Sequence, residues 1–185
     1  MGQIIRLTST LTRASSVTQY TAGDLVTDAG PSLFTFTLPN GVSPQGRILA
    51  CSLVVVPASG NLVITALDGT VYVWKSADAL AAVADNAAYS VTGAYMNKVE
   101  GYFNFVNTAW RNPLGALTAS TDGWQHMTPV NHGVSGAPFS FKDGDALAID
   151  ANRTFSAAMQ VTGAWNPGAV AQAITMHLDL ELTRD

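Results

Sequence analysis

The clearest pattern of hydrophobic and polar positions lies at the end of the chain. From Ile174 to Leu182, every second residue is apolar and the residues between them are polar or charged. An alternation of period two over this length predicts a β-strand with one face on a hydrophobic core and the other towards solvent. A weaker version of the pattern runs from Ile5 to Thr12. Both ends of the chain are therefore expected to form half-buried strands.

Turn-forming residues separate further apolar runs that predict strands. The run from Ile48 to Val56 is rich in β-branched residues and lies between Gly46 and Pro57, which is typical of a central strand. Shorter apolar runs predict additional strands at residues 33–38, 102–106, 146–150 and 157–162.

Local sequence signals also predict one hairpin and one short helix. In segment 62–74, Asp68-Gly69 divides two apolar runs and can supply the positive φ angles of a two-residue type I′ turn. The single helical candidate is segment 77–84, with Ser76 as its possible N-cap. The sequence therefore predicts a hairpin followed closely by a helix.

The succession of these elements predicts an all-β protein. Many short strands separated by turns, with almost no helix, favour an antiparallel β-sandwich that is jelly-roll-like and has at most one short helix. A chain of 185 residues is long enough to bury a core of its own. We therefore expect residues 1–185 to form a single domain.

Residues 12–26 fit neither period. This stretch is rich in Ser and Thr, almost free of charge, and ends in a turn sequence from Tyr20 to Asp24. Hydroxyl side chains satisfy nearby backbone groups and favour extended or turning chain. The stretch is either a polar connection between strands or an extended N-terminal arm, within residues 1–28, that lies on a neighbouring molecule. In the second interpretation Tyr20 is the anchor, and Asp24 forms the turn that aims it.

Composition points towards assembly rather than towards a charged partner. Charged residues make up 12% of the chain, against roughly 25% in ordinary soluble domains. Such a surface has little charge to hold it apart from other proteins, so we expect part of it to be buried in an oligomer or larger assembly. The net charge of −4 and the scattered cations argue against nucleic acid as a partner. The apolar runs are too short for a membrane helix.

The sequence carries no recognisable reaction signature. Cys51 is the only cysteine and lies in an apolar run, which is typical of a buried hydrophobe. His126 and His132 flank Pro129 without a nearby Cys or Glu to complete a metal shell. A nucleophile elbow, a phosphate loop and a dinucleotide fingerprint are all absent from the sequence. We therefore expect a non-enzymatic protein without a metal or cofactor.

Three tryptophans are candidates for contacts with other molecules. Trp110, Trp124 and Trp165 lie near Asn, Asp, Gly or Pro, in predicted loops. An exposed Trp with polar neighbours can stack on a sugar ring or anchor a protein interface. Alternatively, each of these side chains folds back and covers one end of the sandwich.

Several segments, in order along the chain, resemble a family of bacteriophage virion proteins. They begin with Thr12-Arg13-Ala14 and end near Phe103, and none of them is a catalytic motif. In sequence order the segments are 12–14, 18–26, 48–56, 71–74, 84–90 and 101–103. With these segments the chain is similar to the small β-rich decoration or cement proteins of phage capsids.

The resemblance implies a jelly-roll-like module that binds the outer surface of a capsid and bridges neighbouring coat subunits. Its implied partners are the major capsid protein and further copies of itself, as a dimer or trimer. The chain would be synthesised in the host cytoplasm, since its first residues do not resemble a secretion signal. The contact candidates are Arg13, Tyr20, Asp24, Trp110, Trp124 and Trp165. The alternative is a carbohydrate- or receptor-binding module of a virion fibre or tail that uses the three tryptophans.

Overall fold

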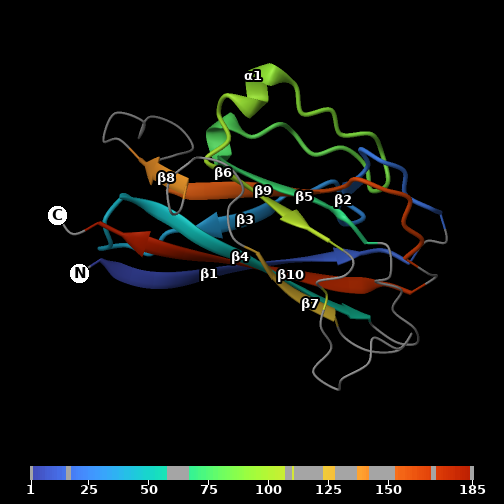
Figure 1. The fold of residues 1–185 in the computed structure, drawn as a ribbon, viewed down its shortest axis with the longest axis horizontal. Helices are drawn as coiled ribbons and strands as arrows, with labels where there is room; N and C mark the ends of the chain where they lie inside the picture. The colour runs from blue at the N-terminus through green and yellow to red at the C-terminus, as the bar shows by residue number, and fades with distance from the viewer. Residues whose placement is uncertain are drawn as a thin grey trace.

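The two alternating segments at the ends of the chain form neighbouring strands. In the computed structural model, β1 (Gln3–Arg13) runs antiparallel to β10 (Gln172–Leu182) along its full length. The termini therefore lie on the same side of the molecule (Figure 1). The structure describes residues 2–15, 18–57, 67–106, 110, 123–127, 137–141, 153–167 and 170–183.

β10 is also the link to the rest of the first sheet. Its other edge pairs with β4 (Gln45–Pro57), the predicted central strand, with a bulge between Asp179 and Leu180. The far edge of β4 pairs with β7 (Gly123–Met127) at one end and with β8 (Ala137–Ser140) at the other. The first sheet therefore has the order β1-β10-β4, followed by β7 and β8, which lie one after the other along the far edge of β4.

The second sheet is built around β9 (Thr154–Val161). One edge of β9 pairs with β2 (Leu25–Val26) and β3 (Phe34–Thr37), and its other edge pairs with β5 (Gly69–Lys75). β6 (Gly101–Phe105) then pairs with the free edge of β5. All of these pairings are antiparallel.

The connections between the sheets identify the fold. β2 and β3 share one position beside β9, and β7 and β8 share one position beside β4. With each pair taken as one strand, the chain crosses to the other sheet at every step except from β5 to β6. This is the topology of an antiparallel jelly roll, so the predicted all-β sandwich is confirmed.

The hydrophobic core lies between the two sheets. Inward residues of β1, β10 and β4 meet those of β9, β5 and β6. The inward residues repeat with period two, except between Ile48 and Cys51, where the bulge shifts the register of β4. Cys51 lies in this core as a free thiol, and burial raises its pKa because the thiolate is poorly solvated there. The inward residues of these strands include Leu11, Leu53, Phe103, Phe105, Phe155, Met159, Met176 and Leu178.

A long excursion between β5 and β6 covers the outer face of the second sheet. Trp74 Nε1 donates a hydrogen bond to the carbonyl of Tyr95 at 3.0 Å, and Tyr89 Oη donates to the carbonyl of Leu80 at 2.7 Å. Trp74 and Tyr89 form a second hydrophobic cluster together with apolar side chains of segment 79–99. Figure 1 shows this excursion, with α1, on the side of the second sheet away from the first. The second sheet is therefore covered on both faces.

The predicted helix at residues 77–84 is wrong. Ser76–Asp78 forms one 3-10 turn, no side-chain bond caps it, and the chain then continues without helix. The short helix α1 (Gly93–Met96) comes later instead. Leu80 and Val83 pack against the cluster around Trp74, and this tertiary packing outweighs the helical preference of the alanines.

The predicted Asp68-Gly69 turn is also wrong. Gly69 lies within β5 and pairs with Phe105 on one side and with Val161 on the other. Both edges of β5 are thus occupied by β6 and β9, so β5 has no edge left for a preceding hairpin strand. Residues 58–66 and the predicted strand at 146–150 lie outside the described residues.

The interpretation of residues 1–28 as an extended arm is wrong for the part of that segment that is described. Residues 3–13 form β1, and the chain after it folds back onto the sandwich. Tyr20 and Trp165 exchange two backbone hydrogen bonds, at 2.8 and 3.2 Å. The amide of Gly23 donates to the carbonyl of Val161 at 2.9 Å. The alternative interpretation, a connection between strands, describes this segment.

Gly69 allows a close approach of strands that any side chain would obstruct. A Cβ there would clash with the carbonyl oxygen of Gln160 and with the Phe105 ring, whereas a Cβ at Gly163 would meet nothing. We expect Gly69→Ala to lower the free energy of unfolding by about 3 kcal/mol or more, as overpacking in a rigid sheet does. Urea denaturation measures the loss, with Gly163→Ala as the control. Equal stability of the two variants would contradict the close approach.

Candidate functional site

A buried ionic cluster joins three segments that are distant in sequence. Arg13 Nε, at the end of β1, donates to Tyr20 Oη at 2.7 Å and lies 3.6 Å from Asp85 Oδ2. Tyr20 Oη donates in turn to Asp85 Oδ1 at 2.6 Å, and the same oxygen accepts the backbone amide of Thr27 at 2.9 Å. Arg13, Tyr20 and Asp85 thus hold β1, the following connection and the cover of the second sheet together.

Aromatic rings complete the surroundings of the Arg13 guanidinium. Its central carbon lies 5.4 Å from the Tyr20 ring centre and 5.9 Å from that of Trp165, within cation–π range. Burial and the neighbouring Asp85 carboxylate both raise the pKa of Tyr20, because they disfavour the phenolate. Tyr20 is therefore held as a neutral hydrogen-bond donor. A charged Arg in this place is tolerable because Asp85 compensates its charge.

Asp24 forms the turn that the sequence predicts. Its Oδ2 accepts the backbone amide of Thr21 at 2.6 Å and the hydroxyl of Thr21 at 2.9 Å. The turn carries Tyr20 inwards onto Trp165, and the two rings lie 5.0 Å apart. The turn therefore aims Tyr20 at its own chain rather than at a neighbouring molecule.

The structure buries most of the predicted contact residues. Arg13 and Tyr20 are 0% exposed, Asp24 is 7% exposed, and Trp110 and Trp165 are each 1% exposed. They cannot contact another molecule while the chain keeps this structure. The burial of Trp110 and Trp165 agrees with the alternative expectation for the tryptophans, in which each side chain folds back and covers part of the sandwich.

Trp110 and Trp124 occupy different parts of the molecule. Trp110 Nε1 donates to the carbonyl of Leu67 at 3.0 Å, and its ring packs on Phe105. Trp124 lies in β7, where its backbone pairs with Val54, and not in a loop as expected. The side chain of Trp124 lies outside the described part of the structure. Among the predicted contact residues whose side chains are described, the structure brings together Arg13, Tyr20 and Trp165.

The outer face of β1-β10-β4 is a surface that no local sequence pattern singles out as a site. The outward side chains of β1 from Arg6 to Thr12 are exposed. Across the strands, Thr8 Oγ1 lies 2.8 Å from His177 Nδ1, and Thr10 Oγ1 lies 2.9 Å from Thr175 Oγ1. Hydroxyl groups therefore form lateral pairs across this face, and the strand register extends these rows onto β4.

The charges on this face are paired across neighbouring strands. Arg6 donates two hydrogen bonds to the Asp179 carboxylate, at 2.6 and 2.8 Å. Arg47 Nε donates to Glu181 Oε2 at 2.5 Å. The alternation of polar residues was visible in the sequence, but the strand order that aligns these charges was not. The face is consequently close to neutral.

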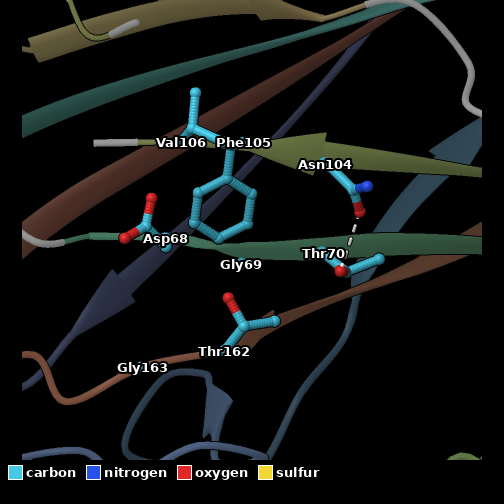
Figure 2. Close-up of a pocket in the computed structure, with 8 residues that line it drawn as sticks. All are labelled: Asp68, Gly69, Thr70, Asn104, Phe105, Val106, Thr162 and Gly163. Carbon is cyan, nitrogen blue, oxygen red and sulfur yellow. Dashed lines mark hydrogen bonds between the residues drawn. The ribbon is translucent and has the colours of Figure 1, made fainter. Parts of the chain in front are cut away.

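A hollow of about 470 Å³ opens at one end of the second sheet. Figure 2 shows the Phe105 ring with Asp68 on one side in view and the Asn104–Thr70 pair on the other. Thr70 Oγ1 donates to Asn104 Oδ1 at 3.0 Å. The described residues that line the hollow are Asp68, Gly69, Thr70, Asn104, Phe105, Val106, Thr162 and Gly163.

The described residues include neither a metal-ligand cluster nor a helix that could span a membrane. Within them, we find no group of three or more His, Cys, Asp or Glu residues that could hold a metal ion. The helices of that same part of the chain are too short or too polar to cross a membrane. His177, one of the three histidines, lies on the outer sheet face, and the side chains of His126 and His132 lie outside the description.

Removal of Asp85 should destabilise the protein strongly. Asp85→Ala leaves the Arg13 guanidinium buried without its counter-ion, so we expect a loss of about 3 kcal/mol in the free energy of unfolding. The control Asp179→Ala breaks the exposed Arg6 pair and should cost under about 1 kcal/mol. The double variant Arg13→Met/Asp85→Ala should lose less than the sum of its single changes. Urea denaturation measures these three variants and the single variant Arg13→Met. Equal losses for Asp85→Ala and Asp179→Ala would refute the cluster's role.

His177 should titrate below its ordinary pKa of 6.5. Burial lowers its pKa first, and the positive charge of Arg6 adds to the effect. The folded state therefore prefers the neutral ring. This preference stabilises the folded state above pH 6.5, and the stabilisation is lost as the pH falls through the lowered pKa of His177. NMR titration of the His177 ring checks this, and Arg6→Gln should move its pKa upwards. A value at or above 6.5 in the unaltered protein would disprove the expectation.

Comparison with known proteins adds similar solved structures but no family. No family model and no curated protein sequence matches the chain. A chain of the cyanophage Pam1 capsid asymmetric unit is 11% identical with a TM-score of 0.35, over 98% of this chain and 86% of that one. A chain of sacbrood virus of honeybee is 9% identical with a TM-score of 0.34, over 99% and 88%. The N-terminal cellulose-binding domain of Cellulomonas fimi β-1,4-glucanase C is 10% identical with a TM-score of 0.26, over 96% and 90%. At these identities and TM-scores the similarity carries no functional argument.

Proposed function

We propose that this chain is a structural protein of a bacteriophage virion that decorates the capsid and bridges neighbouring coat subunits. The observation that carries the proposal is the difference between the two sheets. The outer face of the second sheet is covered by the chain's own segment 79–99, whereas β1 presents exposed side chains on the outer face of the first. We call the outer face of β1-β10-β4 the docking face.

The docking face suits contact with another protein because little charge must be desolvated on it. Arg6 and Asp179 neutralise each other, and so do Arg47 and Glu181. The hydroxyls between these pairs bond laterally, as Thr10 does with Thr175. Polar groups that already have partners cost less to bury than groups that lose their water without replacement. A neutral, small-residue surface of a coat subunit is the partner that matches this face.

The rigidity of the sandwich supports the same role. β1 pairs with β10 along eleven residues, and the Arg13–Asp85 cluster fastens the chain that follows β1. A rigid module loses little conformational freedom when it binds, so many weak contacts repeated over a shell can add up to firm attachment. The ordered resemblance of segments 12–103 to capsid decoration proteins points to the same partner, the major capsid protein. The proposed activity is contact and not catalysis, and the proposed location is the outer surface of the virion.

A charge placed on the docking face should abolish attachment. Thr10→Lys puts an unpaired ammonium on the exposed β1 side of the face, and its burial against a coat subunit costs several kcal/mol. We expect at least about tenfold lower occupancy on capsids stripped of the native protein, since each 1.4 kcal/mol is a factor of ten. Thr37→Lys is the matched control, because Thr37 is an exposed strand threonine of the second sheet. Occupancy is measured by quantitative mass spectrometry of sedimented particles.

Two results would count against the proposal, and they are distinguishable. If Thr10→Lys and Thr37→Lys bind capsids equally well, the docking face is assigned wrongly. If the unaltered chain is missing from purified virions of its own phage, the virion function itself is wrong. Electron microscopy of the native particle then shows whether β1 and β10 face the coat.

A further inference from the structure

Segment 79–99, which covers the outer face of the second sheet, does not reach one end of that sheet. Gln160, Thr70 and Asn104 are neighbours in one row across β9, β5 and β6. The Gln160 amide donates to the carbonyls of Gly23 and Tyr89, so the cover reaches this strand. Asn104, at the other end of the row, is exposed. The hollow of Figure 2 begins where the cover ends.

Gly163 leaves one side of the hollow open, because nothing lies within 4 Å of the place its Cβ would occupy. Gly69 and Gly163 both line the hollow and contribute no side chain. The Phe105 ring occupies the space over Gly69 that a side chain would fill. Val106, 45% exposed, adds an apolar wall beside this ring. A volume of about 470 Å³ lies within the range of small-ligand sites.

The polar groups of the hollow offer both donors and acceptors. The hydroxyl of Thr70 donates to Asn104 Oδ1, which fixes the amide and leaves its Nδ2 hydrogens as donors on the opposite side of the group. The backbone amide of Thr162 donates to the carbonyl of Asp68 at 2.9 Å, and this bond holds their side chains near one another. A carboxylate accepts several hydrogen bonds, and a hydroxyl both donates and accepts.

These groups select the chemical class of the ligand. Asp68 is the one charged residue among the described lining residues, so an anionic ligand would be repelled. Hydroxyls on different sides of a sugar ring match the carboxylate acceptor and the amide donor that lie on either side of the Phe105 ring, and the C–H face of the sugar matches Val106. We propose that the hollow binds one neutral pyranose unit of a glycan. The site is independent of the docking face, because it belongs to the second sheet and leaves the first sheet free.

NMR titration of the full ¹⁵N-labelled chain tests the proposal directly. The probes are the methyl pyranosides of glucose, galactose, mannose and N-acetylglucosamine, together with methyl N-acetylneuraminate glycoside as an anionic probe. At least one neutral probe should cause saturable shifts of the Asn104 side-chain amide and of the Thr162 backbone amide. The anionic probe should bind more weakly than that neutral probe.

Filling the hollow should remove binding without harming the fold. A Cβ at Gly163 meets nothing within 4 Å, and the same holds for Gly30, which does not line the hollow. Gly163→Tyr should weaken the neutral probe at least about tenfold, whereas the matched control Gly30→Tyr should bind like the unaltered chain. Asn104→Ala provides a second variant and should weaken binding about fivefold, as the loss of one hydrogen bond does. Each variant is first checked for an unchanged amide spectrum away from its site.

Three results would overturn the assignment. The first is the absence of a saturable shift with every neutral probe. The second is unchanged affinity in Gly163→Tyr and Asn104→Ala, which would place the bound sugar elsewhere on the chain. The third is preferential binding of the anionic probe, because it contradicts the role of Asp68. None of these results affects capsid occupancy, so the failure of this site and the failure of the proposed function can be told apart.

Discussion

The burial of the Arg13 guanidinium is the constraint on which the rest of the arrangement depends. An inward-facing charge at the end of β1 requires a counter-ion, and Asp85 provides it from a distant part of the chain. Tyr20 bridges the two groups. To form this cluster, the connection after β1 must fold back, and the start of the excursion between β5 and β6 must lie against it. The polar stretch after β1, which the sequence also allowed as an arm, therefore packs on the sandwich of its own chain.

The difference between the outer faces of the two sheets follows from the position of Asp85. The excursion held at Asp85 continues over the outer face of the second sheet, where Trp74 and Tyr89 anchor it through hydrogen bonds to its backbone. The first sheet keeps its outer face exposed along β1, with charges and hydroxyls paired laterally. The outer face of the second sheet is thus used for the chain's own packing, whereas the outer face of the first sheet stays accessible along β1 as the proposed docking face. The hollow beside Asn104 lies where the segment between β5 and β6 no longer covers the second sheet. The extent of that segment therefore determines the position of the hollow, and the docking face lies on the sheet that it does not cover.

Much of the strand content could be predicted from the sequence, because period two is a local property. The predicted strands around Ile48 and Ile174, and the weaker one at Ile5, are all present. Local signals failed where tertiary contacts outweighed them. Gly69 has the sequence context of a turn, yet it serves the close packing of β5 against β9 and the Phe105 ring. The apolar residues after Ser76 suit a helix, yet they pack as non-helical chain against Trp74.

By itself, the sequence determined the all-β class, the half-buried strands at both ends and the low charge that favours assembly. It also determined the Asp24 turn, since an Asp carboxylate that accepts bonds from the residue three positions earlier needs no distant partner. Tertiary structure alone decided which aromatic and charged side chains are accessible. Arg13, Tyr20 and Trp165 are buried because Asp85 and β9 lie beside them, and that proximity depends on strand order. The pairing of Arg6 with Asp179 likewise joins opposite ends of the chain, which no local pattern encodes.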